Sequence, residues 1–187
     1  MRTVGIDLGH RGATATLDAT GRLVRVVRNT PVRGSPSRPR GFDAPGFARE
    51  ARAELDLAQK ADEDMALRVV AEAPAHVRIG GRLHARATGV LFLCAGLWQG
   101  AYAALGVEVE WVAATTWQHE LLANVPGRTT KDRARFRARL LDPALDWNEG
   151  MADAACVAVW GRGVGPPFTG VRPGGLGLSG GGAQPCP

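Results

Sequence analysis

Residues 4–18 read VGIDLGHRGATATLD, and this stretch decides the fold. It opens with an apolar run that ends in Asp7, passes through Gly9 and Gly12, and then alternates between apolar and polar side chains. An apolar run and an alternating run separated by glycines are typical of two strands joined by a tight turn. We therefore predict strands over 3–7 and 13–17, and a third over 23–27 completes an antiparallel meander.

Two further acidic residues stand in equally apolar surroundings. Glu72 follows the apolar run 67–71, which we predict to be a buried strand, and Asp153 lies within the helical stretch GMADAACVAVW. Taken singly, Asp7 could simply end its strand in a turn, and Asp153 could be favoured by a positive helix terminus. Three carboxylates in apolar contexts on separate elements instead call for cations, and they predict a divalent metal site.

The remaining chain alternates between helical patterns and one more strand. The apolar run 107–112 predicts that strand, and helical spacing predicts helices over 47–61, 87–107, 115–123, 129–141 and 146–160. Residues 29–45 and 74–86 are rich in arginine and irregular, so we interpret them as exposed basic loops. This order of elements predicts an α/β fold with a mixed sheet, in which antiparallel strands come first and parallel strands follow.

Size and composition predict one domain. A chain of 187 residues, 45% of them hydrophobic, can bury a single substantial core. We place this domain at 1–161. Residues 162–187 consist largely of glycine and proline, and we predict a disordered tail there.

The charge balance predicts an anionic partner. The formal net charge is +5, and Lys60 and Lys131 are the only lysines among the 23 basic residues. Arginine forms paired hydrogen bonds to phosphate, although a GC-rich genome would also favour it. Cys94, Cys156 and Cys186 are far apart and odd in number, and the start of the chain lacks an export signal. We therefore expect a cytoplasmic protein.

The stretch 87–107 carries no charged residue and is long enough to span a bilayer. Gln99 and several glycines argue against a membrane span, and so do the strand patterns on both sides, which need a packing partner. We therefore predict no membrane contact and interpret this stretch as a buried central helix.

The opening VGIDLG, the strand-end Glu72 and the helix with DAACVAVW, taken in this order, resemble the RuvC-type Holliday junction resolvases of the RNase H-like superfamily, which include bacteriophage members. The resemblance covers residues 1–161. It implies an RNase H-like five-stranded sheet and two Mg²⁺ ions, replaceable by Mn²⁺, held by Asp7, Glu72 and Asp153. The helix that begins with TTKDR also resembles a family helix, which makes Lys131 a candidate for contacting the scissile phosphate or the attacking water. An ordinary solvated charge is the alternative for Lys131.

The sequence departs from the family at one position. Family members usually carry an acid or a histidine three residues before the final aspartate, where this chain has Gly150. Glu149 lies on the same helix face as Asp153 and could be the missing catalytic metal ligand. Asp146 and Glu149 also have the spacing of a capping box, in which case Glu149 would only start the helix. The sequence leaves both roles open.

The resemblance implies a structure-selective endonuclease that resolves four-way DNA junctions by paired, symmetric nicks. Two ions about 3.5–4 Å apart would activate water and stabilise the leaving oxygen. Symmetric cutting implies a homodimer, for which the helix 85–105 is our candidate interface. Phosphates of the branched DNA would be held by arginines of the two basic loops, namely Arg33, Arg38, Arg40, Arg78, Arg82 and Arg86.

Different functions fit parts of the same pattern. Actin-like ATPases and sugar kinases open with a similar acidic, glycine-bearing loop, and GLGLSGGGA near the end of the chain imitates their adenosine motif. Those proteins use two such domains, whereas this chain has room for one. The pattern also fits an RNase H-like or YqgF-like ribonuclease, and it fits a DNA-binding module without catalytic activity.

Overall fold

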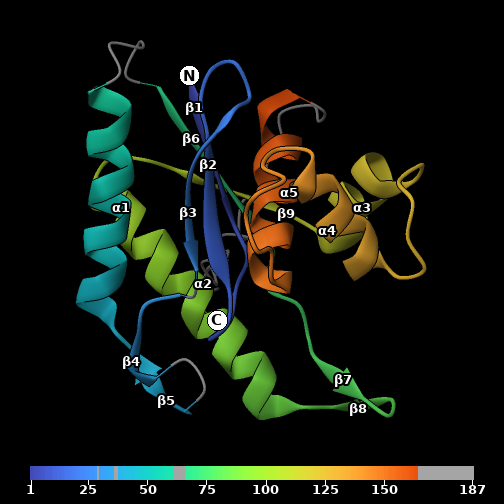
Figure 1. The fold of residues 1–187 in the computed structure, drawn as a ribbon. Coiled ribbons are helices and arrows are strands. Elements are labelled where there is room, and N and C mark those ends of the chain that lie inside the picture. Colours follow the sequence, from blue (N-terminus) through green and yellow to red (C-terminus); the bar gives the residue numbers. More distant parts are fainter. Residues whose placement is uncertain (29, 36–37, 61–65, 164–187) are drawn as a thin grey trace, which may run out of the picture.

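The computed structural model describes residues 1–28, 30–35, 38–60 and 66–163. Its centre is a five-stranded mixed sheet with the order β3-β2-β1-β6-β9 (Figure 1). The strands are β1 (Arg2–Ile6), β2 (Ala13–Leu17), β3 (Leu23–Arg28), β6 (Leu67–Glu72) and β9 (Val109–Val112). The first three pair in antiparallel fashion, and β1, β6 and β9 run parallel. The predicted mixed sheet is therefore confirmed.

Helices cover both faces of this sheet (Figure 1). Two helices pack on one face against β1 and β6, namely α1 (Ala44–Gln59) and α2 (Ala85–Ala103). The other face carries α3 (Ala114–Leu122), α4 (Thr130–Arg139) and α5 (Glu149–Gly163). Alternation along β1 explains the two layers, because Val4 and Ile6 enter the core with α1 and α2 while Gly5 lies between them and faces α5.

The contact between β1 and α5 depends on the absence of a side chain at Gly5. A Cβ atom there would lie 2.1 Å from the carbonyl oxygen of Ala154 and 2.3 Å from the amide nitrogen of Ala158. These distances are far below van der Waals contact, so only glycine allows α5 to pack this closely on the strand. The close packing brings the start of α5 beside the end of β1, where Asp7 follows.

A buried ionic group joins α1 to the sheet. The Glu54 side chain is 1% exposed, accepts a 2.7 Å hydrogen bond from the Thr16 hydroxyl group, and contacts the Arg25 guanidinium group. Arg25 also pairs with Glu50 at 2.7 Å. Because β2 supplies Thr16 and β3 supplies Arg25, this cluster fixes α1 across both strands.

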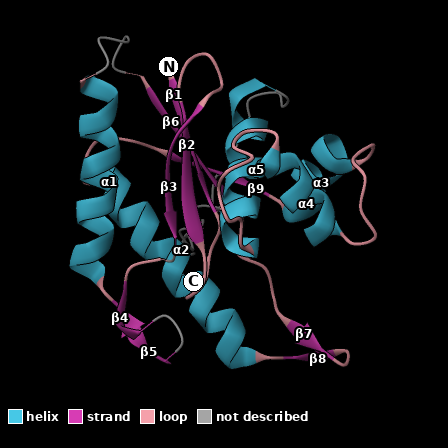
Figure 2. Cartoon of the chain, viewed as in Figure 1, coloured by secondary structure: helices cyan, strands magenta, loops and turns pink. Residues whose placement is uncertain are grey.

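Two of the predicted loops contain hairpins, so the prediction of irregular structure was wrong there. Residues 29–45 include the hairpin of β4 (Val32–Ser35) and β5 (Arg38–Phe42), and residues 74–86 include that of β7 (Arg78–Ile79) and β8 (Arg82–Leu83). In the second hairpin, Gly80 and Gly81 have φ angles of 56° and 79°, as a tight two-residue turn requires. Both hairpins project beyond the main sheet at one end of the molecule (Figure 2).

Several predicted boundaries also differ from the structure. The first helix begins at Ala44, where Pro45 suits a first turn, and the last strand begins at Val109. The last helix begins at Glu149 and continues through Gly163, so residues 162–163 of the predicted tail are helical. Residues 164–187 of that tail lie outside the described residues.

The helix α2 is buried along one side only, so the prediction of a buried central helix holds for that side alone. Trp98 and Tyr102 are in the core, whereas Phe92 and Leu93 are 47% and 57% exposed. Within the described ranges, we find no helix with the length and hydropathy needed to cross a bilayer.

Candidate active site

Asp7 follows the last residue of β1 and is held in a tight turn. Its backbone N–H donates to the Ala13 carbonyl group at 3.0 Å, and the Gly12 N–H donates to the Gly9 carbonyl group at 3.1 Å. Gly9 has a φ angle of 108°, which favours glycine. A Cβ atom on Gly12 would lie 2.2 Å from the Asp7 carbonyl oxygen, so both glycines are needed to form this turn.

Glu72 is the last residue of β6, the strand that pairs in parallel with β1. The indole N–H of Trp117, at the buried side of α3, donates a 3.1 Å hydrogen bond to Glu72 Oε2. Trp117 was not identified from the sequence, because a single tryptophan in a short helix is indistinguishable from an ordinary core residue. In the structure, Trp117 orients the Glu72 carboxyl group at the end of the sheet.

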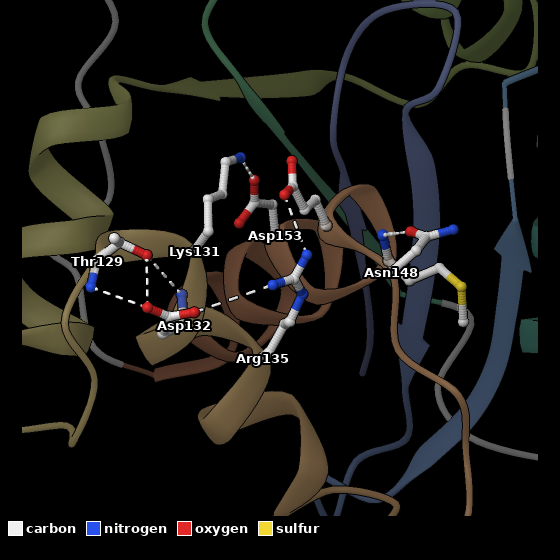
Figure 3. Close-up of polar contacts among 8 residues, drawn as sticks. Thr129, Lys131, Asp132, Arg135, Asn148 and Asp153 are labelled. Carbon is white, nitrogen blue, oxygen red and sulfur yellow. Dashed lines mark hydrogen bonds and ion pairs between the residues drawn. The ribbon is translucent and has the colours of Figure 1, made fainter.

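Asp153 lies in the second turn of α5 and is 3% exposed. Its Oδ2 atom contacts the Nζ atom of Lys131, which reaches across from α4 (Figure 3). Its Oδ1 atom is buried and has no hydrogen-bond partner in the described part of the chain. Asp153 is therefore half compensated, and the helix dipole adds little because its effect fades after the first turn.

The position of Lys131 is unfavourable for its own helix. A capping box formed by Thr129 and Asp132 fixes the start of α4 and places Lys131 in its first turn, near the positive end of the helix dipole. Burial alone would lower the pKa of Lys131, but its hydrogen bond to Asp153 and the charges of Asp153 and Asp7 raise it. The acidic cluster therefore accounts for this lysine better than the role of a solvated helix charge does.

The three carboxyl groups are close enough to affect one another. Burial raises the pKa of Asp7 well above its ordinary value, and the negative charges of Asp153 and Glu72 raise it further. Burial also raises the pKa of Glu72, with a smaller contribution from Asp153, and burial raises the pKa of Asp153. The fold thus gathers the three predicted acids and Lys131 into one electrostatically strained cluster.

Glu149 does not form the capping box with Asp146 that was one of the two roles left open by the sequence. The residue that caps α5 is Asn148, whose side-chain oxygen accepts a 2.9 Å hydrogen bond from the Met151 N–H (Figure 3). Asp146 instead lies outside the helix, where its carbonyl group accepts a hydrogen bond from Arg28. The Glu149 carboxylate pairs with Arg135 at 3.0 Å.

Gly150 occupies the position where the resemblance led us to expect an acid or a histidine. A Cβ atom there would lie 2.4 Å from the Arg11 carbonyl oxygen and 3.1 Å from Asp7 Oδ2. The backbone of the β1–β2 turn therefore fills the space that a side chain would need, which explains the departure in physical terms.

The donor chemistry of the cluster suits a hard divalent cation, because Asp7, Glu72 and Asp153 offer only oxygen atoms and Asp153 Oδ1 is unpartnered among the described residues. In the structure as described, however, no three side chains of the types His, Cys, Asp and Glu are arranged to hold a metal ion. The Lys131 ammonium group provides the positive charge at Asp153 instead.

The predicted arginines lie on the two hairpins and at the start of α2. Arg33, Arg78, Arg82 and Arg86 are exposed, and Arg78 donates to the Gly81 carbonyl group at 3.2 Å. The backbones of Arg38 and Arg40 lie in β5, and their side chains are outside the described part. Beside the second hairpin, a cavity of about 450 Å³ is lined by His10, Val77, His84, Arg86, Ala87, Val90 and Leu91.

A second cavity, of about 400 Å³, adjoins the acidic cluster. It is lined by Arg11, Arg135, Asn148, Glu149 and Gly150, so it lies between the β1–β2 turn, α4 and the start of α5. Arg11 and Arg135 were not identified as site residues from the sequence, because neither residue stands in a recognisable motif.

No protein-family model matches the sequence, and a search of curated proteins finds no match. Solved structures of RuvC are among those similar to the chain. RuvC of T. thermophilus in complex with Holliday junction substrate aligns with 85% of this chain and 91% of its own, at 17% identity and a TM-score of 0.58. A second Thermus thermophilus RuvC structure covers 85% and 92%, at 20% identity and 0.52. The likeness confirms the predicted RNase H-like fold.

Proposed function

We propose that this chain is a divalent-metal-dependent endonuclease that cuts four-way DNA junctions. The observation that carries the proposal is the cluster of Asp7, Glu72 and Asp153 beside Lys131, because carboxyl groups this close and this buried are stabilised in their ionised form by cations. The fold supports the choice of substrate, since one structure that shares it is a RuvC complex with Holliday junction substrate.

In this proposal, Asp7, Glu72 and Asp153 would hold two Mg²⁺ ions, for which Mn²⁺ would substitute. When bound, such ions supply Lewis-acid activation of the attacking water and charge stabilisation for the leaving 3′ oxygen. The Trp117 N–H keeps one oxygen of Glu72 oriented. We retain Glu149 as a candidate fourth metal ligand, although in this structure its carboxylate pairs with Arg135.

The role we propose for Lys131 follows from its contact with Asp153 and its partial exposure to solvent. In the free protein, its ammonium group compensates Asp153. Half of its side chain is exposed, at 48%, so the same group can contact a phosphate that enters the site. Lys131 thus acts on the scissile phosphate as a positive charge that the acidic cluster itself keeps in position.

The arginines of the two hairpins and of the start of α2 are proposed to grip phosphates of the branched DNA without reading its bases. This group comprises Arg33, Arg38, Arg40, Arg78, Arg82 and Arg86. Both hairpins, which carry five of these arginines, project beyond the main sheet at one end of the molecule (Figure 2). Phosphate contacts of this kind make affinity strongly dependent on salt.

Resolution of a four-way junction needs two cuts at symmetric points, so we propose a homodimer with one site in each copy. The exposed side of α2, which carries Phe92 and Leu93, is the candidate interface. A nuclease that acts on recombining chromosomal or phage DNA is expected in the cytoplasm.

The decisive experiment compares the wild type with Asp7→Asn on a synthetic four-way DNA junction, a linear duplex and an RNA–DNA hybrid, with Mg²⁺ or Mn²⁺. We expect paired, symmetric nicks in the junction by the wild type, and binding without cutting by the variant. Cleavage of the hybrid alone would support a ribonuclease instead. If the wild type neither cuts nor binds any of the three substrates, the proposal is overturned.

A further inference from the structure

The second cavity is lined by two arginines and lies close to Asp7. Arg11 follows Asp7 in the β1–β2 turn, Arg135 projects from α4, and both line the cavity of about 400 Å³. Gly150 lies between the cavity and Asp7, since a Cβ atom added to this glycine would be only 3.1 Å from Asp7 Oδ2. A group that enters this cavity would therefore lie near Asp7 and meet two arginines.

Two acidic residues approach Arg135, and one of them is already engaged in other hydrogen bonds. Asp132 approaches it at 4.0 Å, but the Asp132 carboxylate already accepts hydrogen bonds from Thr129 in the capping box. Glu149 approaches more closely, at 3.0 Å, and has no capping role. The Glu149 side chain is 57% exposed, and ion pairs this exposed contribute little stability. The pair between Arg135 and Glu149 is therefore easy to open.

We propose that Arg11 and Arg135 bind a phosphate of the nucleic-acid strand next to the scissile one, and that Glu149 occupies Arg135 in the free protein as a carboxylate that this phosphate displaces. The inference rests on the proposed function, since it supposes a nucleic-acid substrate. Figure 3 shows Arg135 and Lys131 extending in the same direction from α4, so one helix would present both cations to one strand.

Chemistry favours this exchange. The planar fork of arginine donates paired hydrogen bonds to a carboxylate and to a phosphate in the same geometry, so Arg135 need not rearrange. A phosphodiester strand also brings negative charge towards Asp7 and Asp153, which already repel each other. The positive charges of Arg11 and Arg135 would offset this repulsion.

The test measures binding of a four-way DNA junction in the presence of EDTA, by fluorescence anisotropy over a series of salt concentrations. Without metal, the readout is independent of cleavage. We expect Arg135→Ala to weaken binding about tenfold, as for the loss of one charge-assisted contact. It should also reduce the salt slope by about one. Arg11→Ala should act in the same direction. Arg139→Ala removes the same charge one turn further along α4, outside the cavity lining, and serves as the matched control.

The Glu149→Gln variant tests whether Glu149 competes with a phosphate for Arg135 or only changes the net charge of the surface. It should tighten binding several-fold in the wild-type background and much less in the Arg135→Ala background, because its effect acts through Arg135. Arg135→Lys should retain part of the affinity but not the full effect of Glu149→Gln. Thermal melts of each variant exclude unfolding as the cause of a loss.

Two results would overturn the inference while leaving the proposed function intact. One is an Arg135→Ala variant that binds like Arg139→Ala. The other is a Glu149→Gln variant that binds unchanged in EDTA but needs more Mg²⁺ to cleave, which would make Glu149 a metal ligand. If the wild type does not bind the junction at all, the proposed function and the inference both fail. If binding follows the expected pattern but no cleavage occurs, the inference stands and the catalytic proposal fails.

Discussion

Asp153 shows how the fold tolerates a charge in its interior. One carboxylate oxygen contacts Lys131, and the other is buried with no hydrogen-bond partner among the described residues. A buried, half-paired carboxylate is destabilising, and it persists where surrounding packing is strong or a ligand completes it. Here the packing is strong, because α5 lies directly on the glycine of β1.

The burial of Asp7 gives a prediction about protein stability that does not depend on activity. Because the folded protein raises the pKa of Asp7 above its ordinary value of 3.8, the ionised carboxylate destabilises the folded state. In EDTA at pH 7, Asp7→Asn should therefore increase the stability of the protein. A gain of about 1 kcal/mol would raise the melting temperature by about 2–4 °C.

The dependence of this gain on pH has a definite sign. A raised folded-state pKa contributes stability that is present below the unfolded value and is lost as the pH rises through the folded value. The difference between Asp7→Asn and the wild type should thus shrink as the pH falls towards 3.8. Adding Mg²⁺ at pH 7 should stabilise the wild type more than the variant. Melting curves in which Asp7→Asn is less stable than the wild type in EDTA would contradict this account.

At the scale of elements, the ionic cluster that joins α1 to the sheet gives a matched pair of variants. Glu54 is 1% exposed and Glu50 is 27% exposed, and both pair with Arg25. Removal of one partner from a buried ion pair is strongly destabilising. Since Arg25 is 29% exposed and keeps Glu50, we expect Glu54→Gln to lower the free energy of unfolding by about 1–3 kcal/mol.

The more exposed Glu50→Gln should lower the free energy of unfolding by less than about 1 kcal/mol. Urea denaturation followed by circular dichroism measures both variants. Equal effects of the two substitutions would show that burial of Glu54 is not what matters.

The elements that could be predicted from the sequence are those whose pattern repeats over several residues. Strands β1, β2 and β6 each carry an apolar or alternating run, and their ends locate Asp7 and Glu72. The hairpin of β7 and β8 was missed because these strands have only two residues each, too few to show a period. The Gly80–Gly81 pair between them was a turn signal that could have been used.

The acidic residues of the cluster could be predicted from the sequence, but the residues that contact them could not. Acidic residues in apolar runs are anomalous in a sequence, whereas Trp117 and Arg135 are ordinary in theirs. Their contacts with Glu72 and Glu149 span 45 and 14 residues, so only the tertiary structure brings them together. The choice of Asn148 over Asp146 as the cap of α5 likewise depends on where the preceding chain enters the helix.

At the scale of the whole molecule, helices cover both faces of the sheet, but the outer side of α2 is left exposed. The outward side of α2 carries Phe92 and Leu93, and at Gly89, Gly96 and Gly100 an added Cβ would meet no other atom of the described chain within 4 Å. An apolar surface that also permits close backbone approach is typical of a protein interface. A junction has two-fold symmetry, so a second copy of this chain is the partner that the proposed function requires.

We therefore predict that Leu93→Arg converts a dimer into a monomer, measured by size-exclusion chromatography with light scattering. The charge would have to be buried against the same face of the partner copy, near the symmetry axis, where two guanidinium groups would also repel. Leu140→Arg, at the end of α4, changes an equally exposed leucine and should leave the dimer intact. If Leu93→Arg remains dimeric, the interface lies elsewhere. If it is monomeric and still nicks one strand of a junction, without the paired second cut, then pairing of the two cuts depends on the dimer contact at α2.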